Sequence, residues 1–340
     1  MKKKFIAACA LVLSALAFTA CGSTNQKLTF DPNWRSNVLS ETPAGTKETL
    51  TYKIEFEENS FLQKDYFTVK YCATPGSYVT TLEYLEDDTY KYVTELSVPV
   101  EYTMTADKTQ TKAFTDVIKT ETVFKKASEY LKPVYSKETA HCYSPNNFAA
   151  PKIEYAYTEY HYEFLTEYND SLTKGTLTRT DKTPQPRTLL PENRYPGGVS
   201  KTSFEIDQKK YTYLENDQLL FAFRGLSNSA LAVSKTVSVY NASLLSMERI
   251  TTTPAESGKT TFNLSIGGQE TKPYTIEYTP ISIKSNNKNS GISQTLWYAK
   301  TTSNTANQFR NALLKMVVPM HFGLGTLTYT LTKADFSVQA

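Results

Sequence analysis

From residue 47 onward, the sequence repeatedly alternates apolar and polar side chains with a period of two. The first such run has an apolar residue at every second position, namely Leu50, Tyr52, Ile54 and Phe56. Successive side chains of a β-strand point to opposite faces of a sheet, so this pattern predicts strands with one buried face. Similar runs recur as far as residue 331, and helical periodicity is rare. The chain is therefore predicted to be a β-protein.

Short polar turns separate several of these runs. The acidic residues 86–88 join one pair of runs, and residues 169–171 join another. Connections this short favour antiparallel hairpins, because parallel strands need a crossover of a dozen or more residues. The clearest helix signal is residues 218–224, which follow two capping residues, Asn216 and Asp217, and precede Gly225. We predict a mainly β fold: a large curved antiparallel sheet, half-barrel or sandwich-like, with one or two short helices.

The most aromatic segment, 152–168, is predicted to be one long strand inside the sheet. Tyr155 and Tyr157 would share one face of it, and Tyr160 and Tyr162 the other. One interpretation is a central strand with one face in the core and one partly wet face of amphipathic rings. The other is an aromatic wall for a sugar or lipid, with these tyrosines as the ligand face. The next run, 172–179, is richer in threonine and charge and is the predicted edge strand.

The segment 181–202 interrupts the strand pattern with four prolines and the pair Gly197-Gly198. A loop this long is uncommon inside a compact domain. Two organisations therefore stay open: a single β-rich domain over residues 46–340, or two β domains split at 181–202.

The charge of the chain limits its partners. Lysine plus arginine totals 37 and aspartate plus glutamate 34; three of the lysines, and no acid, lie in the first 20 residues. Residues 21–340 are therefore balanced in charge. Nucleic-acid binding rests largely on neutralising phosphates, so we expect no nucleic-acid partner. Apolar residues make up 40% of the chain, which is enough for a sizeable core.

The N-terminus has the pattern of a secretory signal. Three lysines precede an apolar run from Phe5 to Phe18, and small residues follow. The run is shorter than the roughly 20 residues that a membrane-spanning helix needs. Residues 1–20 are therefore predicted to be a signal peptide, which would place the mature chain outside the cytoplasm.

The residues Phe18-Thr19-Ala20-Cys21 resemble the lipobox of bacterial lipoproteins. The resemblance covers about the first 25 residues. It implies cleavage before Cys21, a diacylglycerol thioether on its sulfur, and a further acyl chain such as palmitate on its amine. Two chains suffice for stable anchoring to a membrane. Residues 21–45 would then be a lipidated tether, and the membrane of the bacterial cell envelope would be a partner.

Two further cysteines, Cys72 and Cys142, belong to the predicted mature chain. An exported pair can form a disulfide. Closing a loop of about 70 residues would contribute roughly 4 kcal/mol in the chain-entropy model. We predict that the two residues lie close enough to bond; two buried free thiols are the alternative.

Four common motifs for catalysis or cofactor binding are absent from the sequence. It holds no G-x-S-x-G element, no P-loop, no G-x-G-x-x-G and no C-x-x-C. The three histidines are far apart, and only His161 shares a strand face with a nearby carboxylate, Glu163. We predict no catalytic residue, no metal and no cofactor. The sequence favours a non-enzymatic protein; an enzyme whose site is assembled from distant residues stays the alternative.

The order of elements in the second half resembles the LolA/LolB-like lipoprotein carriers. It runs from the short helix at 217–225 through paired strands to Leu296-Trp297-Tyr298-Ala299, an apolar strand at 313–320 and a closing strand at 327–331. The resemblance covers residues 203–338. It implies a half-barrel, in which one long antiparallel sheet curls around a hydrophobic cavity and helices plug the mouth.

Two functions follow from these expectations. The first is a membrane-anchored extracytoplasmic lipoprotein that binds a lipid or another apolar or amphipathic ligand on its curved sheet. The second is a surface interaction or structural module that contacts the envelope, a glycan or a protein. A cavity enclosed by the sheet would favour the first, and rings packed as ordinary core would favour the second.

Overall fold

The protein is a β-protein built on one continuous sheet, seen here in a computed structural model. The predicted mainly β fold, with a curved antiparallel sheet and short helices, is confirmed. No helix in the described part of the chain has the length and apolar character needed to cross a membrane. The structure describes residues 28, 30, 44–59, 67–127, 130–145, 151–184, 197–288, 290, 292–300, 311–320 and 324–337. The predicted signal peptide and Cys21 lie outside these residues.

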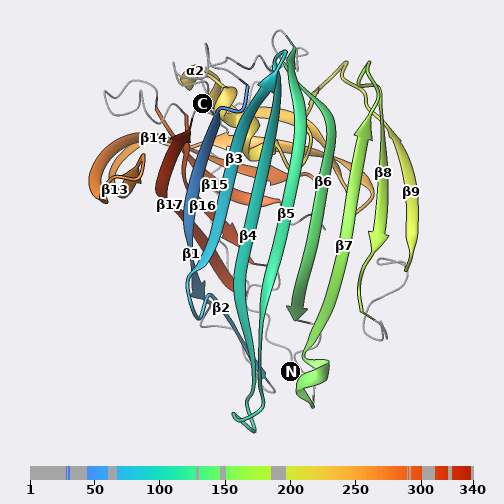
Figure 1. Ribbon diagram of the computed structural model, residues 1–340, viewed down its shortest axis with the longest axis vertical. Helices are drawn as coiled ribbons and strands as arrows, with labels where there is room; N and C mark the ends of the chain where they lie inside the picture. The colour runs from blue at the N-terminus through green and yellow to red at the C-terminus, as the bar shows by residue number, and fades with distance from the viewer. Residues whose placement is uncertain are drawn as a thin grey trace, which may run out of the picture.

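The first half of the chain forms a broad wall of long strands (Figure 1). Consecutive strands from β3 to β9 pair antiparallel, and β2 pairs with the end of β4. The short 3-10 turn η2 (Ile153–Tyr155) precedes β7. The strands are β1 (Lys47–Glu58), β2 (Phe67–Tyr71), β3 (Gly76–Glu86), β4 (Thr89–Met104), β5 (Thr111–Ala127), β6 (Tyr130–Pro145), β7 (Tyr157–Tyr168), β8 (Lys174–Asp181) and β9 (Val199–Glu205).

The second half combines short helices with shorter strands. Strands β13 to β17 form a closed ring, because β14 pairs with β13 and β15, β16 pairs with β15 and β17, and the end of β13 pairs with β17. The elements are β10 (Thr212–Tyr213), α1 (Leu219–Ala222), η3 (Phe223–Gly225), α2 (Asn228–Leu231), β11 (Lys235–Asn241), β12 (Ser246–Pro254), β13 (Gly258–Ile266), β14 (Lys272–Ser285), β15 (Ser293–Ala299), β16 (Leu313–Pro319) and β17 (Gly325–Ser337).

Strand β1 joins the two halves into one sheet. It pairs with β3 on one side and with β17 on the other, from Lys47 opposite Ser337 to Glu58 opposite Gly325. The proline-rich segment does not separate two sheets, because β8 and β9, the strands that flank its middle, pair with each other. Residues 185–196 of that segment lie outside the described part of the chain.

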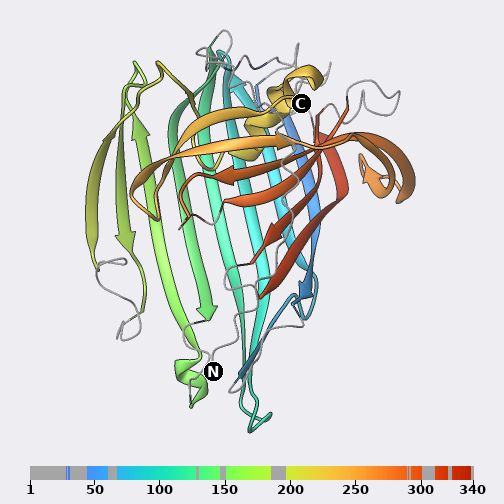
Figure 2. The same ribbon diagram turned by 180° about the vertical axis from the view of Figure 1, so that it is seen from behind.

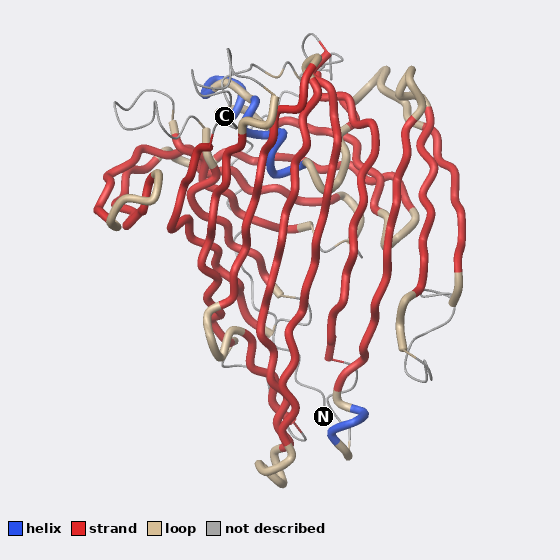
Figure 3. The backbone as a smooth tube through the Cα atoms, viewed as in Figure 1, coloured by secondary structure: helices blue, strands red, loops and turns tan. Residues whose placement is uncertain are grey.

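The sheet curls so that the strands of the second half cross the inner face of the long strands, as Figure 2 shows. Helix α1 lies between the two layers near one end of the long strands (Figure 3). Its Phe221 ring is 5.1 Å from the ring of Tyr92 on β4 and 5.3 Å from that of Phe124 on β5. The main hydrophobic core therefore fills the concave side of the sheet.

Buried tyrosines link the layers of this core. Their rings bury apolar area, and the hydroxyls of two of them bond to backbone carbonyls across the core. The Tyr52 hydroxyl donates to the carbonyl of Leu313 at 2.8 Å, and the Tyr298 hydroxyl donates to that of Leu220 at 2.8 Å. Each bond joins segments that are far apart in the sequence. The high tyrosine content thus has a structural use in the interior.

Helix α1 lacks the predicted cap. Its N-cap residue is Gln218, which makes no side-chain capping bond. The Asp217 carboxylate instead accepts a hydrogen bond of 2.9 Å from the Ser136 hydroxyl on β6. Packing of Phe221 against the sheet holds this one-turn helix, since a helix so short gains little from its own hydrogen bonds.

The predicted edge strand is wrong. Strand β8 pairs with β7 and with β9, so β9 is the edge. A second hydrophobic cluster fills the seam where the β9 end of the sheet approaches β10 and β11. There the rings of Phe204 and Tyr240 stack 3.6 Å apart, and the hydroxyls of Tyr168 and Tyr213 lie 3.0 Å apart. Side chains thus close the seam between the two ends of the sheet.

An ion pair is buried between β1 and η3. The guanidinium of Arg224 donates to both carboxylate oxygens of Glu48, and the Nη2 to Oε2 distance is 3.1 Å. Each residue is only 4% exposed. Two charges taken out of water stabilise a fold only while they stay paired.

We expect Arg224→Ala to lower the free energy of unfolding by about 3–5 kcal/mol, because it leaves the Glu48 carboxylate buried without its partner. The double variant Glu48→Leu/Arg224→Met should recover most of this loss, since no charge is then buried. Urea denaturation followed by circular dichroism measures both. A double variant as unstable as Arg224→Ala would show that packing, and not the uncompensated charge, causes the loss.

Candidate functional site

The four tyrosines predicted as a ligand face do not form one surface. Residues 153–155 form the turn η2, so the strand begins at Tyr157 and not at 152. Ile153 and Ala156 are both buried, and their spacing of three fits a 3-10 turn and not a strand. Tyr155 consequently leaves the strand face and is 49% exposed.

The remaining tyrosines of this segment separate by face. Tyr162 is 1% exposed and packs in the second hydrophobic cluster, with Tyr160 partly buried against that cluster. Tyr157 packs on the other side, where its ring lies 4.6 Å from Phe114 and 5.4 Å from Tyr102. The predicted inside position of this strand is observed, because β7 pairs with both β6 and β8.

The predicted disulfide is not formed, and both Cys72 and Cys142 are free thiols. The backbone N–H of Cys72 donates to the carbonyl of Pro99 on β4 at 2.8 Å, whereas Cys142 lies on β6. Strand β5 lies between β4 and β6, so three strand spacings, about 14 Å, separate the two residues. A disulfide needs Cα atoms within roughly 7 Å.

A cluster of rings and polar groups lies where β6 ends and β7 begins, at the lower end of the long strands in Figure 1. The register of the two strands places His141 directly opposite His161. Their imidazole rings stack 4.6 Å apart with an interplanar angle of 11°. We call this group the rim cluster; its members are Phe114, His141, Tyr143, Tyr157, Glu159 and His161, all partly exposed.

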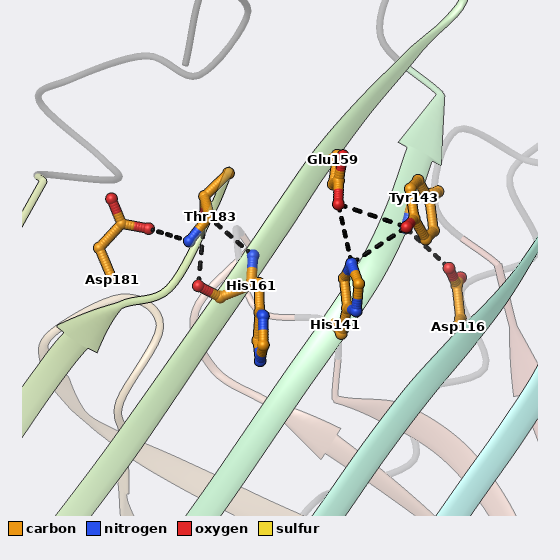
Figure 4. A network of polar contacts seen from close by, with 7 residues as sticks. All are labelled: Asp116, His141, Tyr143, Glu159, His161, Asp181 and Thr183. Carbon is orange, nitrogen blue, oxygen red and sulfur yellow. Dashed lines mark hydrogen bonds and ion pairs between the residues drawn. The ribbon is translucent and has the colours of Figure 1, made fainter. Parts of the chain in front are cut away.

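Three polar groups of the rim cluster form a closed hydrogen-bonded triangle (Figure 4). The Nε2 atom of His141 is 2.9 Å from Oε1 of Glu159 and 3.0 Å from the hydroxyl of Tyr143. The Tyr143 hydroxyl also donates to the same Glu159 oxygen at 3.3 Å. The triangle fixes the orientation of the His141 ring and of the carboxylate.

Rings continue the cluster across three strands. The Phe114 ring on β5 stacks on that of Tyr143 at 4.0 Å, and the Tyr143 ring lies 5.2 Å from that of His141. Phe114 and Tyr157 also pack against the main core. The rim cluster is therefore continuous with the interior.

Side chains replace backbone bonds at these strand ends (Figure 4). The regular β5–β6 pairing ends with Val117 opposite His141. Beyond it the backbone N–H of Tyr143 donates to Oδ1 of Asp116 at 2.7 Å. On the other side the backbone N–H of His161 donates to the Thr183 hydroxyl at 3.0 Å. These bonds hold the strands in place where the ladder stops.

The environment shifts the titration of this region. Burial raises the pKa of Asp116 to about 7, although the Tyr143 N–H and His141 oppose the shift. Burial, His141 and Lys182 lower the pKa of His161. Burial and then Glu159 raise the pKa of Tyr143 to about 12. At neutral pH the Tyr143 phenol is therefore neutral and the His161 imidazole largely so.

Three further carboxyl groups lie inside the sheet, on β6 and on the chain after β10. They belong to Glu138, Glu215 and Asp217. Burial is the main cause that raises the pKa of each, and repulsion from Asp217 adds to the shift of both glutamates. Each of these carboxyls therefore binds its proton more tightly than an exposed carboxyl does.

A half-open pocket with a mixed lining lies beside β2. Its volume is about 350 Å³; Phe56, Val69, Tyr71 and Cys72 supply its apolar lining, and Glu58, Thr68 and Lys70 supply its polar lining. The Phe56 and Tyr71 rings meet edge to face, with centroids 5.3 Å apart. The volume is at the lower end of the range of small-molecule pockets.

The rim cluster offers groups for binding. It presents stacked rings, one carboxylate, two imidazoles and two phenols on paired strands. Among the described residues, no three histidine, cysteine, aspartate or glutamate side chains are placed to hold a metal ion. The sequence pointed to His161, but not to the stacking of His161 on His141 or to the bond between His141 and Glu159, because both contacts depend on the register of β6 and β7.

Comparisons with known proteins add a fold resemblance. No model of a known protein family matches the chain. No curated protein matches it either. The chain is similar to a crystal structure described as a beta-barrel-like protein of domain of unknown function DUF1849 from Brucella abortus. The match covers 87% of this chain and 100% of that chain, with 8% sequence identity and a TM-score of 0.46. Identity and score this low support no statement about a shared site or function.

We expect Asp116→Asn to flatten the dependence of stability on pH. The folded pKa of Asp116 lies above its ordinary value near 4, so its contribution to stability is complete below about pH 4 and is lost as the pH rises through 7. This group alone gives a slope of up to about 1.4 kcal/mol per pH unit in that window. Denaturant melts from pH 4 to 8 measure the difference between variant and wild type.

The control for this experiment is Asp170→Asn, at an exposed turn. It should leave the wild-type slope unchanged, because an exposed carboxyl gains little from the fold. The buried carboxyls on β6 and after β10 contribute equally to all three proteins and cancel. If the unfolding free energies of Asp116→Asn and wild type change in parallel with pH, the raised pKa of Asp116 is contradicted.

Proposed function

We propose that this protein is a lipid-anchored, extracytoplasmic envelope protein that acts by binding, with the rim cluster as its contact surface. The lipobox-like residues ending in Cys21 support the anchor. The observation that carries the binding role is the rim cluster itself, in which rings and hydrogen-bonding groups lie partly exposed on rigid strands. Pre-organised groups lose little entropy when a partner binds.

The residues near the proposed anchor support a body held close to the membrane. Leu28 and Phe30 are buried in the main core, and the backbone N–H of Leu28 donates to the Thr212 hydroxyl at 2.8 Å. Cys21 precedes Leu28 by seven positions. A chain of that length spans at most about 25 Å when fully extended.

A second function, binding of a small amphipathic ligand, is favoured by the pocket beside β2. The described rings of the concave face are packed as core, so this ligand would bind beside β2 and not along the whole sheet. Native mass spectrometry of the purified full chain should then show a bound species of small mass. Val69→Trp, which fills the pocket, should abolish that adduct. An adduct that persists in the variant would count against this site.

We expect Cys21→Ala to move the protein from the membrane fraction to the soluble exported fraction. The substitution removes the sulfur that would carry the diacylglycerol, and no other lipid attachment is proposed. Fractionation with metabolic labelling by a palmitate analogue measures both effects. A wild-type protein without label, together with unchanged membrane partition of the variant, would refute the anchor.

A further inference from the structure

We propose that the rim cluster is a glycan-binding site that takes the flat faces of pyranose rings. The inference names a partner class for the contact surface, and so rests on the proposed binding function. It needs no lipid anchor, because every member of the rim cluster belongs to β5, β6 or β7.

A continuous strip of rings runs through the rim cluster. The Phe114 and Tyr143 rings are 4.0 Å apart, those of Tyr143 and His141 5.2 Å, and those of His141 and His161 4.6 Å. The strip therefore crosses three strands without a gap. A pyranose ring presents apolar C–H faces of about the same size as an aromatic ring, and such faces pack on one another.

Polar groups lie beside these rings. A sugar carries hydroxyls around its apolar faces, and each hydroxyl can donate and accept. The Glu159 carboxylate accepts, while the Tyr143 hydroxyl and the His141 imidazole can do either. Their mutual bonds hold them at fixed positions, so a sugar meets an ordered set of partners and not mobile side chains.

The charge of the rim cluster favours a neutral partner. The six members include one carboxylate and no lysine or arginine. Burial of the ring, and then repulsion from His141 and Lys182, lower the pKa of His161 and so keep it largely neutral at pH 7. A phosphate or an anionic lipid surface is recognised by clustered cations. The rim cluster lacks them, so it fits a neutral, hydroxyl-rich partner.

The rim cluster is accessible to a partner in solution. In the triangle, the side chain of His141 is 37% exposed and that of Glu159 is 31% exposed. Tyr155, just before β7, adds a 49% exposed ring. The surface is open and not enclosed, which suits a chain of linked sugars that passes over it. We therefore expect oligosaccharides to bind better than single sugars.

The experiment is calorimetric titration of the purified full chain with cellotetraose and chitotetraose. Both probes present extended rows of flat pyranose faces. We expect binding of at least one probe, and a loss of about tenfold or more in the association constant in Tyr143→Ala. Glu159→Gln keeps the shape of the side chain and should weaken binding less, by removing the charged acceptor.

The matched control is Tyr135→Ala. Tyr135 lies on the same strand, partly exposed, and its hydroxyl donates to Glu121 at 2.6 Å, so it copies the tyrosine–carboxylate pair outside the rim cluster. Its loss should leave the association constant unchanged. Thermal melts of all variants establish that they fold. If Tyr143→Ala does not fold, Glu159→Gln supplies the test.

Three outcomes would overturn the inference: no binding of either probe, equal weakening by Tyr143→Ala and Tyr135→Ala, or binding of anionic vesicles through the same residues in place of sugars. The lipid label on Cys21 is independent of all three. Loss of the label would refute the anchor and leave the glycan site standing, whereas loss of sugar binding alone would remove only this partner class.

Discussion

Strand β1 has a different half of the sheet on each of its two sides, and the rest of the fold depends on this position. Its twelve-residue ladder with β17 converts two separate sets of strands into one sheet. That sheet can then curl until its second half covers the inner face of its first. The buried pair of Glu48 and Arg224 acts at the same place, because it ties β1 to the helical turn between the layers. Without β1, each half would expose one apolar face and one open edge.

The interior explains why the rim cluster is rigid. A chain of rings runs from Tyr102 in the core to Phe114 and Tyr157 of the rim cluster. Tyr102 is fully buried and donates to the Tyr143 carbonyl at 2.7 Å, so a core residue positions a surface one. The core therefore holds the surface rings in fixed positions. A site built this way needs no loop to close over it.

Local pattern predicted the strands well, because burial of one face is visible in a short stretch such as 50–56. Register was not predictable, since it depends on how segments far apart align. The stacking of His141 on His161 and the separation of Cys72 from Cys142 are both consequences of register. Strand β9 was not predicted, because none of its side chains is fully buried and it follows several prolines. The segment 181–202 therefore resembles a loop. The lipobox-like residues lie outside the described part of the chain, so the proposed anchor stays a prediction from sequence.

The β1–β17 ladder also fixes the order of events during biogenesis. Strand β1 lies near the start of the folded body, and its partner ends at Ser337. One side of β1 therefore lacks its partner strand until residues 325–337 have been synthesised. Contacts so distant in sequence form slowly, and an open strand edge invites pairing with other chains. The fold therefore depends on β17 reaching the open side of β1 before another chain does.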